Sequence, residues 1–235
     1  MNKELYVIIT AGGLGTRMGS KIAKQFLTLN DRPILLKTIE LFKEWREDAN
    51  IILVLPQKYK EYWKEYCSEN NIWIKHTIVS GGITRFHSVK NALQLVPENA
   101  IVAVHDGVRP FVPKDLITNL FNYPFNAEKN KCGIIPILPA IDSMRKKIIN
   151  SEGETTETQT INREEYISVQ TPQVFLSTQL KECYNKAYSP SFTDDATVME
   201  SNGYFIETLE GSRLNIKITT PEDLIMAEAI STIMQ

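Results

Sequence analysis

Short hydrophobic runs are spaced along this chain, and the segments between them place hydrophobic residues every three or four positions. Runs of this length, bounded by glycine or polar residues, are typical of strands buried in a parallel sheet. We therefore expect strands at residues 5–10, 51–55, 74–79, 101–105 and 132–138.

The intervening segments have the periodicity of amphipathic helices. Hydrophobic side chains in residues 33–45 fall on one helical face. The same spacing predicts helices at residues 59–67, 85–95 and 113–121. A last helix is expected from residue 220, because Thr220 is a good N-cap and Pro221 suits the first helical position.

Strands that alternate with helices indicate βαβ units with right-handed crossovers. The predicted fold is therefore α/β, with a Rossmann-like, mostly parallel sheet and helices on both faces. In such sheets ligands bind beyond the carboxyl ends of the strands. The loops at residues 11–18, 80–84 and 106–109 each follow a predicted strand. We expect these three loops to converge on one site.

Residues 141–169 interrupt this alternation. The centre of the segment is polar (SEGETTE), and its flanks, 142–149 and 158–161, can pair as a hairpin. A polar hairpin that leaves an α/β domain buries little of itself, so it is either mobile or docks on a partner chain. We expect one domain over residues 1–235, with this segment as an extended β-arm.

Composition narrows the classes of function. The chain has 235 residues, of which 43% are hydrophobic and 23% charged, and its formal charge is −2. Without a basic excess, a nucleic-acid partner is not expected. The 3 cysteines are far apart and form no C-x-x-C pair, which fits the cytoplasm and argues against a zinc cluster. The first hydrophobic run is too short for a signal peptide, and no run approaches the roughly 18 residues of a membrane span.

A glycine-rich loop, AGGLGTRM at residues 11–18, follows the first predicted strand. Glycines let the backbone approach a ligand closely, and successive N–H groups in such a loop form an anion site. Arg17 and Lys24 add cations suited to a polyphosphate. The alternative is a tight turn with solvated charges. The spacing matches neither the Walker A motif nor the dinucleotide fingerprint. The loop instead resembles that of nucleotidyltransferases acting on sugar or polyol phosphates.

A carboxylate stands at the end of the fourth predicted strand, in HDGVRP at residues 105–110. Asp106 at this position is well placed to hold Mg²⁺ against phosphates. The alternative is an ion pair between Asp106 and Arg109 that stabilises the loop. His105 is expected to be structural, because His76 and His87 offer no metal-ligand spacing with it.

Three further segments contain candidate functional residues. In residues 81–88, two glycines before a helix can admit a base or ribose, and Ser88 can hydrogen-bond it; the alternative is an ordinary loop. Thr193 is first of all expected to cap a helix. Residues 210–219 read as a turn that feeds a short strand. Lys217 on that strand, taken alone, reads as a solvated edge lysine.

Together, these motifs run in order along nearly the whole chain. They are AGGLGTRM with Lys24 and Gln25, GGITRFHS (81–88), HDGVRP (105–110), TPQVF (171–175), TDDA (193–196) and EGSRLNIKITTPEDL (210–224). The chain resembles the 2-C-methyl-D-erythritol 4-phosphate cytidylyltransferases of the non-mevalonate isoprenoid pathway. It departs from the family at Ile83 and Thr84, where an acidic pair is common, and at Gly107 and Val108, where small residues, often alanines, are usual.

The resemblance implies a single nucleotidyltransferase domain that joins CTP to a polyol phosphate and releases pyrophosphate, with Mg²⁺ as cofactor. It implies catalytic roles for Arg17, Lys24 and Lys217. The implied nucleotide-binding residues are Ala11, Gly12, Gly13, Gly15, Gly82, Ser88, Asp106 and Gly107, with Asp106 also the metal ligand. The implied substrate-binding residues are Arg109, Arg163, Thr171 and Thr193.

By the same resemblance the arm crosses a homodimer, so that Arg163 serves either its own site or the neighbouring subunit's. Two other interpretations stay open at this point. One is a ribitol-5-phosphate cytidylyltransferase, a close relative. The other is a catalytically silent nucleotide-binding regulator, which the joint presence of Arg17, Lys24, Asp106 and Lys217 disfavours.

Overall fold

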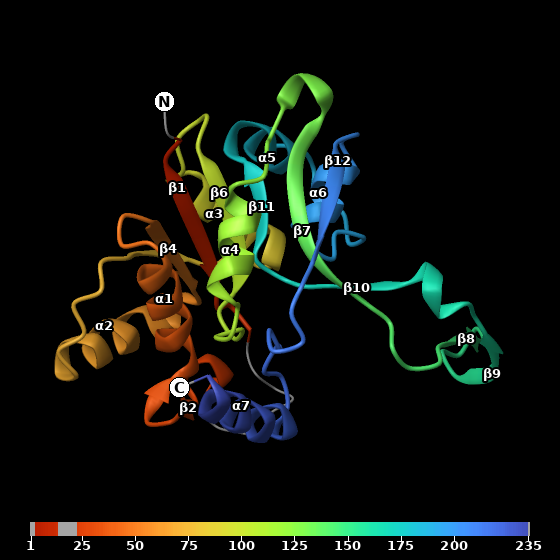
Figure 1. Ribbon diagram of the computed structural model, residues 1–235, viewed down its shortest axis with the longest axis horizontal. Helices are drawn as coiled ribbons and strands as arrows, with labels where there is room; N and C mark the ends of the chain where they lie inside the picture. The colour runs from red at the N-terminus through yellow and green to blue at the C-terminus, as the bar shows by residue number, and fades with distance from the viewer. Residues whose placement is uncertain (1–2, 14–22, 235) are drawn as a thin grey trace.

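The central feature of the computed structural model, which describes residues 3–13 and 23–234, is an eight-stranded mixed sheet (Figure 1). Its strand order is β10-β7-β11-β6-β1-β4-β5, and β12 pairs with β7. The strands are β1 (Leu5–Thr10), β4 (Asn50–Leu55), β5 (Thr77–Ser80), β6 (Ile101–Asp106), β7 (Lys131–Pro139), β10 (Ile167–Val169), β11 (Gln173–Leu176) and β12 (Phe205–Glu210).

Most neighbouring strands of this sheet run parallel. β6, β1, β4 and β5 form one parallel block, and β12 is parallel to β7. β11 lies between β6 and β7 and is antiparallel to both, and β10 is antiparallel to β7. The predicted mostly parallel α/β sheet is therefore confirmed.

The helices lie on both faces of the sheet, as predicted. They are α1 (Ile34–Trp45), α2 (Lys60–Glu69), α3 (Arg85–Leu93), α4 (Lys114–Phe121), α5 (Ser177–Tyr184), α6 (Asp195–Glu200) and α7 (Pro221–Ile233). A short β2–β3 hairpin (Thr28–Leu29 and Arg32–Pro33) precedes α1. Thr220 caps α7 in a capping box with Asp223, which confirms the predicted helix start.

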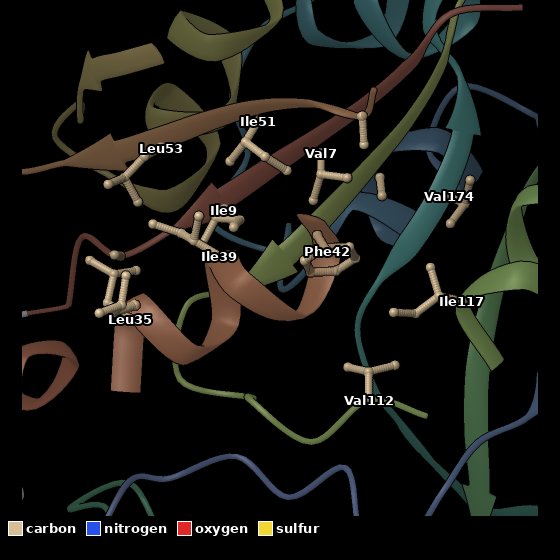
Figure 2. Packing of buried hydrophobic residues seen from close by; sticks show 14 of the residues in the cluster. Val7, Ile9, Leu35, Ile39, Phe42, Ile51, Leu53, Val112, Ile117 and Val174 are labelled. Carbon is tan, nitrogen blue, oxygen red and sulfur yellow. The ribbon is translucent and has the colours of Figure 1, made fainter. Parts of the chain in front are cut away.

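Alternating side chains of the buried strands separate the core into two layers. Val7 and Ile9 of β1 pack with side chains of α1, α2 and α4 (Figure 2). Ile8, which points to the other face, packs with side chains of α3, α5 and α6. Because both faces are buried, the strands read as continuous hydrophobic runs, and this is why the sequence revealed them.

The predicted hairpin is formed by β8 (Arg145–Ile149) and β9 (Thr155–Thr160), which pair antiparallel. Every residue of both strands is exposed. Figure 1 shows the hairpin extending away from the main sheet. Arg145 holds the two strands together through Thr158 and Thr160. Within the described residues, each helix is too short or too polar to cross a bilayer.

Two predictions about strands were wrong. The third strand begins at Thr77 rather than at residue 74, because the side chain of His76 folds back onto the carbonyl of Ile74. The strand expected around Lys217 is absent, and residues 211–219 form neither helix nor strand. This segment is held by side-chain contacts rather than by a strand ladder.

Candidate active site

A cleft of about 780 Å³ lies at the carboxyl ends of β1, β4, β5 and β6. Parallel strands end at the same edge of a sheet, so the loops that follow them meet there. The lining residues are Thr10, Ala11, Gly12, Gly13, Lys24, Gln25, Pro56, Gln57, Gly81, Gly82, Ile83, Thr84, Arg85, Ser88, Asp106, Val108 and Lys217. The predicted convergence of the three loops is confirmed for their described residues.

The glycine loop is described as far as Gly13, and Gly15 and Arg17 lie outside the described residues. A buried glutamine holds its first part. Gln25 donates from Nε2 to the carbonyl of Ala11 at 3.0 Å, and the Ala11 N–H donates to Val54 at 3.0 Å. Lys24 precedes Gln25 in a single turn of 3₁₀ helix, so the same turn that anchors the loop brings a cation to the cleft.

The loop between β5 and α3 is tightly closed. A side chain at Gly82 would place its Cβ 2.4 Å from Cβ of His87, so this position requires glycine. The Gly82 N–H donates to Oγ of Ser88 at 3.0 Å, and that hydroxyl donates to the carbonyl of Thr84 at 2.9 Å. Ser88 therefore shapes the loop from within. Ile83, at 90% exposure, lies on the wall of the cleft.

Asp106, at the end of β6, is the centre of a charged cluster. Its Oδ2 accepts from Nε of Arg109 at 3.1 Å and lies 3.0 Å from Nζ of Lys217. Burial alone would raise the pKa of Asp106, but the cations Lys217, Arg85 and Arg109 outweigh it and hold the pKa well below its usual range. Asp106 is therefore an anion between cations at the floor of the cleft.

The structure shows where the side chain of Lys217 lies. Its ammonium group reaches into the cleft to Asp106, and its side chain is 43% exposed. The expectation of a solvated edge lysine was wrong, because residues 211–219 wrap back toward the end of β6 instead of forming a strand. The Ile218 N–H donates to the carbonyl of Val108 at 3.0 Å, which ties this segment to the loop after Asp106.

Behind Asp106 lies a buried network that contains the predicted structural histidine. His105 is fully buried, with Nε2 3.0 Å from the carbonyl of Arg109 and Nδ1 3.1 Å from Oγ1 of Thr171. Burial lowers the pKa of His105 to about 4, so the ring is neutral at physiological pH. Oγ1 of Thr171 also accepts from the Asp106 N–H at 3.1 Å. This network holds the backbone of Asp106 in place.

Comparison with known proteins gives the context of this cleft. The family model described as 2-C-methyl-D-erythritol 4-phosphate cytidylyltransferase matches residues 5–233. The chain belongs to this family. It is 48% identical to the enzyme of that name from Azobacteroides pseudotrichonymphae, over 97% of this chain and 99% of the relative. With the Bacteroides fragilis enzyme it shares 45% identity over 95% and 97% of the two chains.

Solved structures of the family have the same fold. The enzyme from Thermus thermophilus superposes with a TM-score of 0.72 at 30% identity, covering 97% of this chain and 99% of the other. The 4-diphosphocytidyl-2C-methyl-D-erythritol synthase from Anaerococcus prevotii gives a TM-score of 0.75 at 27% identity, covering 98% and 96%. The chain is a nucleotidyltransferase with the fold of its family, and a ribitol-specific enzyme or a silent regulator is not favoured.

The residues assigned to the polyol phosphate by family resemblance lie outside the cleft lining. Thr171 is buried, and its hydroxyl bonds Asp106 and His105. Arg163 is exposed near the β8–β9 hairpin and donates to the carbonyl of Ile141. Arg109 is nearly buried, and its Nη1 donates to the carbonyl of Asn215 at 2.7 Å.

Two other predicted site residues are Thr193, just before α6, and Gly107, just after β6. The N-cap of α6 is Asp194, whose Oδ1 accepts from the Thr197 N–H at 2.9 Å, so the prediction that Thr193 caps this helix was wrong. Thr193 instead pairs its hydroxyl with that of Thr197 at 3.2 Å. Gly107 lies just behind the cleft lining, where an added Cβ would come within 3.2 Å of Ala11 and Ile9.

Sequence reasoning missed several contributors to the cleft, among them Gln57 and Arg85. Gln57 lies two residues beyond the end of β4, in a loop that the strand prediction already placed at the binding edge. Arg85, the first residue of α3, lines the cleft and pairs with the buried Asp195 at 2.5 Å. Asp195 also accepts from the hydroxyl of Tyr184 at 2.6 Å. The link from Arg85 to α6 has no sequence signal, because more than 100 residues separate the partners.

Proposed function

We propose that this protein transfers the cytidylyl group of CTP to 2-C-methyl-D-erythritol 4-phosphate. A phosphate oxygen of the polyol attacks the α-phosphorus of CTP, the bond to the β-phosphate breaks, and pyrophosphate leaves with the bonding electron pair. Family membership over nearly the whole chain supports this reaction. The structural observation that carries it is the ammonium group of Lys217, held 3.0 Å from Asp106 in the same cleft as the glycine loop.

The nucleophile is already a phosphate anion, so the reaction needs no general base and no covalent enzyme intermediate. Catalysis then consists of positioning the two phosphates and stabilising the charge that gathers at the α-phosphorus. Lys217 and Lys24 are the described cations suited to that charge, and Arg17 is expected to join them. The backbone N–H groups of residues 11–15 would cradle the β- and γ-phosphates.

Asp106 is the residue that would hold Mg²⁺. Mg²⁺ is usually bound by one or two carboxylates together with substrate phosphates and water. The described residues contain no cluster of three His, Cys, Asp or Glu side chains, so substrate phosphates and water would supply the other ligands of Mg²⁺. A charged carboxylate at the floor of a phosphate cleft fits this donor set. Mg²⁺ bound there would neutralise phosphate charge.

The loop between β5 and α3 is suited to select cytosine. The amino group of cytosine is a hydrogen-bond donor, so it would bind backbone carbonyls of this loop rather than the Gly82 N–H, which already donates to Ser88. Uracil presents a carbonyl oxygen at the same place, which would face those carbonyls without a proton between them. A site built to bind a donor rejects such an analogue strongly. We expect CTP to be preferred over UTP even though Ile83 and Thr84 replace an acidic pair.

The polyol phosphate and the assembly are linked. We propose a homodimer in which the β8–β9 arm rests on the partner subunit and Arg163 contributes to the partner's phosphate site. The exposed position of Arg163 and the projection of the neighbouring β8–β9 hairpin away from the main sheet (Figure 1) support this arrangement. Thr193, whose side chain is exposed, would contact the same substrate, whereas the buried hydroxyl of Thr171 would act through Asp106 and His105. The 3 cysteines, all free, support a cytoplasmic enzyme.

Release of pyrophosphate tests the proposed reaction. CTP and UTP are each combined with 2-C-methyl-D-erythritol 4-phosphate or with ribitol 5-phosphate. We expect release with CTP and the methylerythritol phosphate, and a kcat/KM at least about 10²-fold lower for UTP. Equal use of ribitol 5-phosphate would contradict the proposed substrate. Absence of release with every pair, in protein shown to bind CTP, would contradict the activity itself.

A further inference from the structure

The segment that carries Lys217 has no helix or strand to fix it. Residues 211–219 are joined to the body of the protein by few backbone bonds. The Gly211 N–H donates to the carbonyl of Ile137 at 2.8 Å, and the Ile218 N–H donates to Val108 at 3.0 Å. Between these two anchors the position of the segment depends on side chains that reach it from elsewhere.

Gln170, just after β10, is the first of these side chains. Its Nε2 donates to the carbonyl of Ser212 at 2.8 Å and to that of Asn215 at 3.3 Å. Its Oε1 accepts from the Ser212 N–H at 3.2 Å and from Nδ2 of Asn215 at 3.3 Å. A single buried amide therefore bonds both ends of the turn that precedes Lys217.

Asn215, within the segment, makes further hydrogen bonds to the body of the protein. Its Nδ2 also donates to the carbonyl of Thr171 at 2.9 Å, and its own carbonyl accepts from Nη1 of Arg109 at 2.7 Å. Among the described residues, the buried Oδ1 of Asn215 has no hydrogen-bond partner. Asn215 therefore joins the segment to Gln170, Thr171 and Arg109 at the same time.

Gly211 makes the close approach of Gln170 feasible. A Cβ at this position would lie 2.4 Å from Oε1 of Gln170 and 3.1 Å from the carbonyl of Ile137. The glycine therefore lets the turn lie directly against the glutamine amide. Any larger side chain would push the amide away from Ser212 and Asn215.

We propose that Gln170 and Asn215 are positioning residues that hold Lys217 in register with Asp106 and the α-phosphate of the nucleotide. The inference rests on the proposed role of Lys217 in the reaction. Arg109 donates hydrogen bonds to both Asp106 and the carbonyl of Asn215. The hydrogen bonds of Asn215 therefore help to fix the segment of Lys217 relative to Asp106. Misplacement of a reacting or stabilising group by about 1 Å can lower a rate by roughly 10²-fold.

The test is a double-mutant cycle between Gln170 and Lys217. Gln170→Met keeps the length of the side chain and removes its hydrogen bonds. We expect this variant to lower kcat by about 10- to 100-fold, with the KM for CTP within about threefold of wild type. In the Lys217→Met background, the same change should lower kcat by less than about threefold. Coupling of this kind is what a residue acting through Lys217 must show.

Ser177→Ala is the matched control for stability. Ser177 is fully buried, and its hydroxyl bonds Pro97 and Ala100 at the opposite end of the sheet. Its loss should lower the urea midpoint to a similar extent while kcat stays within about twofold. Gly211→Ala is a second perturbation of the same contact, to be used if Gln170→Met does not fold. It should lower kcat and lose its effect in the Lys217→Met background.

The outcomes separate the two proposals. If Lys217→Met turns over within about threefold of wild type, the proposed role of Lys217 is wrong. If Lys217→Met is severely impaired but Gln170→Met lowers kcat by the same factor in both backgrounds, Lys217 is catalytic and the positioning role is overturned. A loss of kcat in Ser177→Ala equal to that in Gln170→Met would also overturn it.

Discussion

Replacement of Lys217 by methionine should lower kcat strongly and the free energy of unfolding only slightly, and the structure allows both changes to be estimated. Methionine keeps most of the side chain's length and removes only its charge and donors. The ammonium group contacts Asp106 at 3.0 Å, but the Lys217 side chain is 43% exposed. Its loss therefore removes an ion pair that water already screens, while Arg109 still donates to the same carboxylate.

The expected magnitudes differ clearly. Because Lys217 is partly exposed and Arg109 still pairs with the buried Asp106, we expect a fall of about 1 kcal/mol in the free energy of unfolding, closer to the loss of an exposed pair than of a buried one. A donor aimed at charge that develops in the transition state contributes about 2.7–4 kcal/mol, or roughly 10²–10³ in kcat. We therefore expect a protein that folds almost normally and turns over at least about 100-fold more slowly.

The assay is pyrophosphate release at saturating CTP, paired with urea unfolding of the same preparations. Lys114→Met is the control for loss of a lysine charge, because Lys114 is exposed to a similar extent and forms a 3.1 Å pair with the exposed Glu44 away from the cleft. The control should lose neither activity nor more than about 1 kcal/mol of stability. The reasoning is refuted if both lysine variants keep similar activity, or if Lys217→Met loses activity only in proportion to its unfolding.

Four other outcomes are expected. Lys24→Ala should lower kcat by roughly 10²–10³ in the pyrophosphate assay, and turnover within about threefold of wild type would contradict its role. Asp106→Asn should keep the fold but lose Mg²⁺-dependent activity in a metal titration; an unchanged Mg²⁺ dependence would leave Asp106 only as the ion-pair partner of Arg109. The pKa of His105 is about 4 in the folded protein and about 6.5 in the unfolded chain, so between these two pH values only the unfolded chain binds the proton. The free energy of unfolding should therefore fall by about 3 kcal/mol as the pH is lowered from about 6.5 to 4. His105→Gln should flatten that part of the urea-measured profile. Arg163→Ala should abolish use of the polyol phosphate while CTP binding is spared. Mixing this variant with Lys24→Ala should restore activity, because each heterodimer would contain one intact site. A lack of rescue despite subunit exchange, or a monomer in sedimentation, would contradict the shared site.

The sequence by itself determined the layers of the fold and the edge at which ligands bind. Buried parallel strands must be hydrophobic on both faces, so residues 5–10, 51–55 and 101–105 were visible as continuous runs. Because parallel strands end at one edge, the loops after them had to meet. The capping signal at Thr220 is equally local, and it placed the last helix correctly.

Other predictions failed where distant contacts overrode the local pattern. Ile216 and Ile218 flank Lys217 with the alternation of a strand, yet no strand partner is present beside them in the described chain. Gln170 and Asn215 bond the segment instead, and these partners lie more than 40 residues apart. The N-cap of α6 shifted from Thr193 to Asp194, which also accepts from Gln173 of β11.

Only the tertiary structure decided which groups the charged residues contact. In the sequence, Asp106 beside Arg109 suited either a metal site or an ion pair, and Lys217 read as a solvated lysine. Folding brings Lys217 to the same carboxylate from 111 residues away in the chain, and it pairs Arg85 with the buried Asp195 across 110 residues. Hydrophobic periodicity is a property of neighbouring residues, so it can be read locally. The electrostatic field at a buried carboxylate depends on every charge that folding brings near it, and it therefore exists only in the folded protein.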